Sequence, residues 1–114
     1  MNEKYEEIAK KYENILSCSI ECNNGWLDII NYACWHINRR VYNMNYTNFK
    51  IVQIKEKFGS LRIYTTSSDD YINGVVAMAA SMSMCTCEVC GNKGSTRADN
   101  PWVRTLCDEC NNKS

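Results

Sequence analysis

Cys87-Glu-Val-Cys90-Gly91 and Cys107-Asp-Glu-Cys110 are the two stretches that decide how the C-terminal quarter of this chain folds. Each Cys-x-x-Cys pair forms a tight turn that directs two thiolates at one point, so the two pairs offer the four ligands of a tetrahedral Zn²⁺ site. Gly91 supplies the backbone freedom that the first turn needs after its second cysteine. The sequence therefore predicts one structural zinc ion per chain, held by Cys87, Cys90, Cys107 and Cys110. Two disulfides or free thiols are the alternative.

Length and composition indicate one small domain. The 114 residues suffice for a core over residues 1–84 and a zinc module over residues 85–114. Thirteen basic and 13 acidic side chains balance, which argues against a general polyanion-binding protein. The charged N-terminus predicts no signal peptide, and no segment reaches the length of a transmembrane helix. We therefore expect a cytoplasmic protein without membrane contact, in which metal binding explains the cysteines better than disulfides do.

Three segments carry apolar residues at helical spacing, which predicts helices over residues 3–16, 26–42 and 69–84. The third helix can begin at any of three capping residues, Ser67, Ser68 or Asp69. Its small and methionine side chains suit close packing across a sheet, while an exposed Met and Ala surface that receives a partner helix is the alternative. The apolar faces of the second and third helices could bury each other or a second copy of the chain, which leaves a homo-oligomer open.

Residues 50–66 predict a β-hairpin that turns at Gly59 and Ser60. Its alternation places four aliphatic side chains on the inner face: Val52, Ile54, Leu61 and Ile63. The outer face carries Lys55, Lys57, Arg62 and Tyr64, and the segment has a net charge of +3 in a neutral chain. Bases and a tyrosine on a strand can bind phosphate and stack on a nucleobase. An ordinary solvated sheet face, whose lysines protect an exposed edge, is the alternative.

The connection between the two cysteine pairs adds further candidates for ligand binding: Arg97, Trp102 and Arg104. Residues 102–106 alternate as a strand does, and a tryptophan beside a small zinc site can equally be a packing residue. His36 is the only histidine and has no neighbouring carboxylate or serine partner, so it is weak support for catalysis.

The remaining cysteines have irregular spacings: Cys18, Cys22, Cys34 and Cys85. We expect the first three to be small buried hydrophobic residues, with a second metal site that includes Cys34 or His36 as the alternative. Cys85 lies two residues before Cys87 and could replace a zinc ligand, but the x-x spacing favours Cys87 with Cys90.

Two resemblances extend this interpretation. Residues 85–110 resemble a zinc ribbon or treble-clef-like module, which serves nucleic-acid binders, protein adaptors and structural staples alike. The whole chain is similar to a family of small bacteriophage and prophage proteins without an established activity, through three blocks: residues 25–30, residues 53–64 and residues 87–107. That resemblance implies a viral accessory protein in the infected bacterial cytoplasm. Its implied role is anti-defence, by inhibiting a host protein or by sequestering a nucleotide signal.

The sequence thus predicts an α+β fold in which two N-terminal helices, a hairpin and a third helix form a core that a C-terminal four-cysteine zinc ribbon closes. The predicted function is that of a non-enzymatic binding protein whose ligand is a host protein or a small anionic nucleotide. A nucleic-acid-binding transcriptional regulator is the first alternative, and its affinity would fall with salt. A metal-dependent nuclease is the second, although four cysteines saturate zinc and leave no open position for water.

Overall fold

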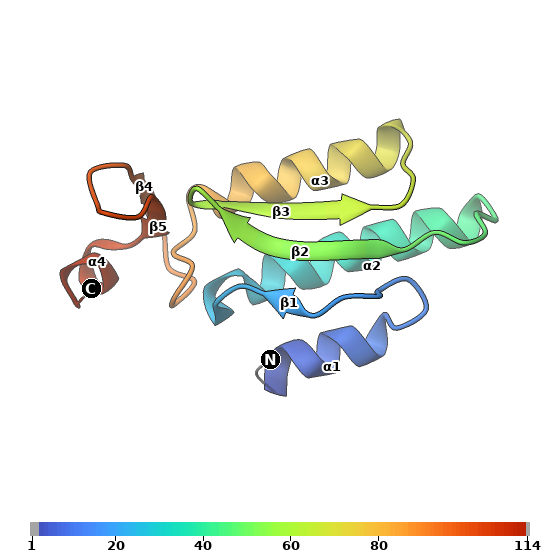
Figure 1. Cartoon of the computed structure of the whole chain (residues 1–114), viewed down its shortest axis with the longest axis horizontal. Coiled ribbons are helices and arrows are strands. Elements are labelled where there is room, and N and C mark those ends of the chain that lie inside the picture. Colours follow the sequence, from blue (N-terminus) through green and yellow to red (C-terminus); the bar gives the residue numbers. More distant parts are fainter. Residues whose placement is uncertain (1–2, 114) are drawn as a thin grey trace.

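The computed structural model describes residues 3–113 and consists of an α+β core followed by a small C-terminal cysteine module (Figure 1). The core contains, in order, α1 (Glu3–Lys11), β1 (Ile20–Glu21), the 3-10 turn η1 (Asn24–Trp26), α2 (Leu27–Asn43), β2 (Ile51–Lys57), β3 (Ser60–Thr65) and α3 (Asp70–Ser83). The module adds β4 (Ser95–Arg97), β5 (Arg104–Leu106) and α4 (Asp108–Lys113). The predicted fold class, α+β with a C-terminal four-cysteine module, is confirmed.

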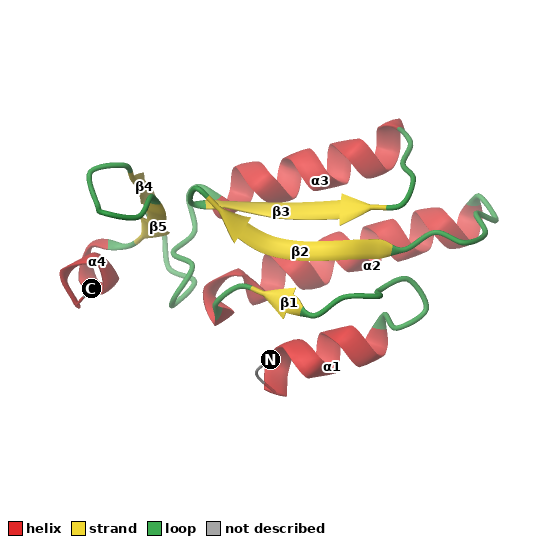
Figure 2. Cartoon of the chain, in the orientation of Figure 1, coloured by secondary structure: helices red, strands yellow, loops and turns green. Residues whose placement is uncertain are grey.

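The core sheet has the strand order β1-β2-β3. β2 and β3 form the expected antiparallel hairpin, and β1 pairs with β2 in parallel. In the view of Figure 2, α2 and α3 lie side by side behind this sheet, while α1 lies beyond β1. Ile54, Leu61 and Ile63 are buried on the helix-covered face of the hairpin, as the alternation predicts.

The two long helices run in opposite directions. The guanidinium Nε of Arg40, near the end of α2, binds the Asp69 carboxylate just before α3 at 2.9 Å. At the other end, the Trp26 indole N–H donates to the carbonyl oxygen of Thr86 at 2.9 Å. Among residues 3–113, no helix combines the length and the apolar character that a membrane crossing requires.

The first helix is shorter than the predicted segment 3–16, because it ends at Lys11. The chain then turns, and its next residues pair with the start of β2. The Ile51 N–H donates to the Ile15 carbonyl at 2.6 Å, and the Ser17 N–H donates to the Ile51 carbonyl at 3.0 Å. Ile15 is therefore buried in the core while its backbone pairs with the start of β2.

The hairpin differs from its prediction at two points. The turn lies at Phe58 and Gly59, whose φ angles are 54° and 80°, one residue before the predicted Gly59–Ser60 turn. The strand pairing shifts register between Ile51 and Gln53, so Val52 is 44% exposed and does not lie on the inner face. Ile51 is fully buried. A bulge of this kind interrupts the alternation from which the inner face was predicted.

Candidate metal centre

The first cysteine pair lies on a tight turn that glycine makes possible. The Gly91 N–H donates to the Cys87 carbonyl at 2.9 Å, and the Cys87 N–H donates to the Asn92 carbonyl at 2.7 Å. Gly91 has a φ of 84°, a conformation that side-chain-bearing residues rarely adopt. The backbone conformation after Cys90 therefore favours glycine, as the sequence predicts.

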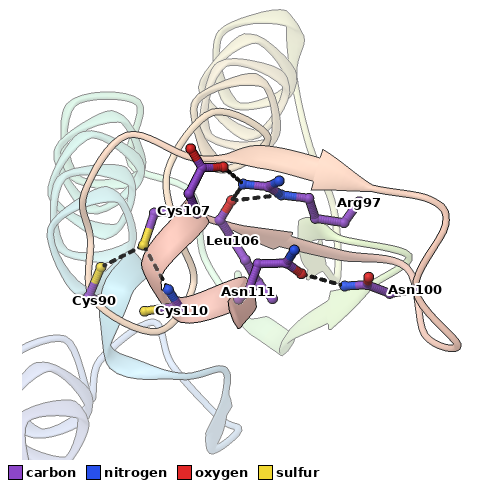
Figure 3. Close-up of polar contacts among 8 residues, drawn as sticks. Cys90, Arg97, Asn100, Leu106, Cys107, Cys110 and Asn111 are labelled. Carbon is purple, nitrogen blue, oxygen red and sulfur yellow. Dashed lines mark hydrogen bonds and ion pairs between the residues drawn. The ribbon is translucent and has the colours of Figure 1, made fainter. Parts of the chain in front are cut away.

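The second cysteine pair lies at the start of a helix. The hairpin of β4 and β5 leads directly into Cys107, and Cys110 follows within α4. The Cys110 N–H donates to the Cys107 Sγ at 3.4 Å (Figure 3). The module thus runs from a cysteine turn through a two-stranded hairpin into a short helix that carries the last cysteine.

The four thiol sulfurs are close enough to share one metal ion. All four Sγ atoms lie within 4.8 Å of one another, and the Cys90 and Cys107 sulfurs are 3.6 Å apart. Four sulfurs at a zinc–sulfur distance of about 2.3 Å around a tetrahedral ion would be separated by about 3.8 Å. Cys87 and Cys107 are buried, whereas Cys90 is exposed. The donor set and its spacing therefore fit a single tetrahedral metal ion.

The surroundings of Cys87 lower the pKa of its thiol. Burial alone would raise the pKa of Cys87, but hydrogen bonds from the backbone of Cys107, Cys90 and Val89 outweigh it and lower the pKa to about 6. Hydrogen bonding to the Cys107 thiol, followed by burial, raises the pKa of Cys110 to about 12. A bound cation would keep all four thiols deprotonated, because coordination favours the thiolate.

The first cysteine turn is hydrogen-bonded to the segment around η1, directly before α2. The Gly25 N–H donates to the Glu88 carbonyl at 2.6 Å, and the Asn23 N–H donates to the Glu88 carboxylate at 3.1 Å. The Tyr5 hydroxyl in turn donates to the Asn23 carbonyl at 2.5 Å. Glu88 is 5% exposed, and burial raises the pKa of its carboxyl group. This buried polar contact joins α1, α2 and the metal module.

The module hairpin is fastened to the tip of the core hairpin. The hydroxyl of Thr105, which is fully buried, donates to the Gly59 carbonyl at 2.6 Å. The Thr105 carbonyl accepts from the Glu88 N–H at 3.0 Å. The module therefore contacts the core on two sides, at Gly25 and at Gly59.

The three candidates between the cysteine pairs have separate environments. The Arg97 guanidinium binds the Leu106 carbonyl at 3.0 and 3.2 Å and the Asp108 carboxylate at 2.7 Å, so it joins β4 to the start of α4 (Figure 3). Arg104 is partly buried opposite Arg97, and Trp102 is 79% exposed in the loop between the two strands. Arg97 is thus engaged within the module. Arg97 and Arg104 lie on the same face of the β4–β5 hairpin, whereas Trp102 lies in the loop between the strands.

The predicted outer face of the core hairpin does gather its four residues on one side of the sheet. Lys55 lies directly opposite Arg62, and Tyr64 lies opposite Gln53. Glu21 lies beside Lys55 on the neighbouring strand, so the row across the sheet carries an acid as well as two bases. Lys57 is exposed at the end of β2. Ligand binding by these residues stays a prediction.

The other cysteines and the histidine lie apart from the metal centre. Cys34 is fully buried in the core. Cys18 and Cys22 are partly buried and pack against the core, as expected of small hydrophobic residues. Burial raises the pKa of Cys22 and of Cys34 to about 12 in each case, which keeps them protonated. Cys85 is exposed and lies outside the four-cysteine cluster.

A groove of about 640 Å³ lies between α2 and α3. The sequence alone did not identify the residues that line it. Its floor is formed by small or branched side chains, including Ile29, Ala33 and Ala79. Its rim consists of four large apolar side chains with 45 to 65% of their surface exposed: Tyr32, Tyr71, Met78 and Met82. The methionine-rich pattern of residues 69–84 indicated half of this surface, but α2 supplies the other half.

Comparison of the chain with family models, with curated proteins and with solved structures finds no match. The resemblance to bacteriophage proteins therefore stays an expectation, and we infer function from the metal centre and from the groove.

Proposed function

We propose that the metal is zinc and that its role is structural. Four cysteine ligands at tetrahedral spacing are the donor set that structural zinc sites use, and they fill its coordination sphere. The buried contacts of Glu88 and Thr105 tie the same module to the core, so metal binding would hold the C-terminal region in place. Native mass spectrometry should detect one zinc ion per chain, and a metal-free, fully folded chain would contradict the proposal.

We propose that the protein is a non-enzymatic binding protein that receives a partner protein in the α2–α3 groove. The observation that carries this proposal is the rim of exposed tyrosine and methionine side chains around an apolar floor. Contiguous apolar surface of this kind marks interaction sites, because exposing it to water is unfavourable. In keeping with the resemblance to phage proteins, the proposed partner is a protein of a bacterial host, whose inhibition would counter a host defence.

The experiment that tests this function compares a methionine within α3 with a methionine just after its last residue. Met78 lines the groove and is 63% exposed, whereas Met84 follows α3 outside the groove and is 50% exposed. Met78→Glu and Met84→Glu add the same charge, so affinity purification with the two variants separates groove binding from a general surface effect. A partner identified by mass spectrometry should be lost only with Met78→Glu. Equal recovery with both variants would contradict binding in the groove.

A small anionic nucleotide on the outer hairpin face is the second candidate function. The direct opposition of Lys55 and Arg62 supports it, because like charges opposite each other on a sheet repel and a bound anion would relieve that repulsion. Nucleotides should then raise the melting temperature of the wild type but not that of an Arg62→Gln variant. An unchanged melting temperature across a nucleotide set would remove this candidate.

A further inference from the structure

Resting on the proposed function, we propose that the occupant of the α2–α3 groove is an amphipathic α-helix of the partner protein. We further propose that this helix carries a basic residue at each end of its apolar stripe. The groove lies between two antiparallel helices, and its lining residues recur at intervals of three or four along each of them. This is the arrangement that accepts the ridge of a third helix.

The dimensions of the groove suit three turns of helix. Its lining extends along α3 from Asp70 to Met82, which is about 18 Å at the rise of an α-helix. Gly74 lies within this lining and is open, since a Cβ added there would meet nothing within 4 Å. A helix backbone can therefore approach closely at the middle of the groove, between the flanking Tyr71 and Met78.

Each end of the groove carries one carboxylate, and His36 also lines it, with its Nδ1 3.3 Å from the Tyr71 hydroxyl. Asp28 lies in the first turn of α2, and Asp70 lies in the first turn of α3. Because the two helices are antiparallel, these carboxylates lie at opposite ends of the apolar floor. Arg40 lies near the Asp70 end, stacked over Tyr71, but its guanidinium is bound to Asp69. Lysine or arginine at both ends of the incoming stripe would complement this pattern.

The same charges disfavour a second copy of the chain as the occupant. Two grooves packed face to face would bring the acidic ends of one against the acidic ends of the other, whichever direction the second copy takes. Like charges at such positions oppose association. The acidic ends therefore distinguish a basic partner helix from self-association.

Synthetic peptides test the inference without a known partner. The probe is an 18-residue helix-forming peptide with leucines between two lysines placed eleven positions apart, which is about 17 Å and returns to the same helix face. The control peptide has glutamate in place of both lysines. Fluorescence anisotropy with labelled peptides should show binding of the lysine peptide to the zinc-loaded protein, and the glutamate peptide should bind at least about fivefold more weakly.

Variants of the protein complete the test. The double variant Asp28→Asn/Asp70→Asn should bind the lysine peptide about fivefold more weakly, Met78→Glu should abolish binding, and Met84→Glu should leave it unchanged. Both carboxylates also stabilise the first turn of their own helix, so melting temperatures are recorded alongside. The comparison of the lysine and glutamate peptides uses the wild-type protein, so it still tests the inference if the double variant folds poorly.

The outcomes separate this inference from the proposed function. Equal affinity for both peptides, abolished by Met78→Glu, would overturn the basic ends and keep the groove as a protein-binding site. No peptide binding, together with a partner protein lost from Met78→Glu, would overturn the helix and keep the function. A dimer that Met78→Glu dissociates would overturn both, because a second copy would then fill the groove.

Discussion

Gly25 lies directly against the backbone of Cys87, and this contact joins the metal centre to the core. A Cβ on Gly25 would lie 2.0 Å from the Cys87 carbonyl oxygen and 2.4 Å from the Glu88 carbonyl carbon. Gly91, on the other side of the cysteine turn, approaches Gly25 as well, since a Cβ there would lie 3.3 Å from the Gly25 carbonyl oxygen. Two glycines thus allow two backbone segments, more than sixty residues apart in sequence, to touch.

Gly25→Ala should therefore destabilise the zinc-loaded protein by about 3 kcal/mol, because the added methyl group overlaps backbone atoms that cannot rotate away. Gly74→Ala is the matched control, since its methyl group meets nothing within 4 Å and alanine favours the helix by about 0.5–1 kcal/mol. Urea unfolding followed by tryptophan fluorescence measures both free energies, and Trp26 lies next to the contact. Equal stabilities of the two variants would show that the module does not dock on Gly25.

Removal of the metal should unfold the C-terminal module. Cys87→Ser eliminates the most buried ligand, and metal binding in such modules contributes on the order of 10 kcal/mol. Hydrogen exchange should then rise over residues 86–113 while the core sheet stays protected, and native mass spectrometry should show no zinc. Cys85→Ser is the control, because Cys85 is exposed outside the cluster. A Cys87→Ser protein with an unchanged melting temperature would contradict a structural metal.

Asp69 should make the stability of the core depend on pH in the acid range. Hydrogen bonds from the Ile72 N–H and the Tyr46 hydroxyl, together with Arg40, lower the pKa of Asp69 from 3.8 to about 2. A lowered pKa in the folded state means that the stabilisation is complete above pH 3.8 and is lost as the pH falls through about 2. Asp69→Asn keeps an oxygen for the helix cap but has no carboxylate to titrate.

The melting temperature of Asp69→Asn should therefore fall less than that of the wild type between about pH 5 and pH 2, by thermal denaturation followed with circular dichroism. The neighbouring Asp70→Asn is the control, because Asp69 and not Asp70 is bound to Arg40 and Tyr46. Parallel pH profiles for the wild type and Asp69→Asn would show that this carboxylate does not link folding to pH.

Local chemistry explains what could be predicted from the sequence. The clustering of the four candidate metal ligands follows from spacing within two short turns, and the hairpin and long helices follow from periodicity within single segments of the chain. Asp69 was among the three predicted caps and accepts the Ile72 N–H at 2.8 Å. Each of these features is specified by residues that are neighbours in the chain, so no knowledge of the tertiary structure was needed.

Contacts between distant segments explain the rest. β1 has only two residues, Ile20 and Glu21, and its pairing with β2 more than thirty residues later stabilises it. Val52 turns outward because of a register shift, which an alternating pattern does not reveal. The groove needs α2 and α3 side by side, so the methionines of α3 could indicate an exposed apolar face but not the tyrosine and aspartate that α2 contributes.

Ser83 provides a last test, because it joins the end of α3 to the edge strand of the core sheet. Its side chain is fully buried, and its Oγ accepts the Leu61 N–H at 2.9 Å and donates to the Ala80 carbonyl at 2.6 Å. Ser83→Ala would leave the Leu61 N–H buried without this acceptor, which should cost about 1–3 kcal/mol in urea unfolding. Ser81→Ala, on the exposed side of the same helix turn, should change stability by less than about 0.5 kcal/mol. If both alanines changed the free energy of unfolding equally, the hydrogen bond from Leu61 to Ser83 would contribute nothing measurable to the packing of α3 on β3.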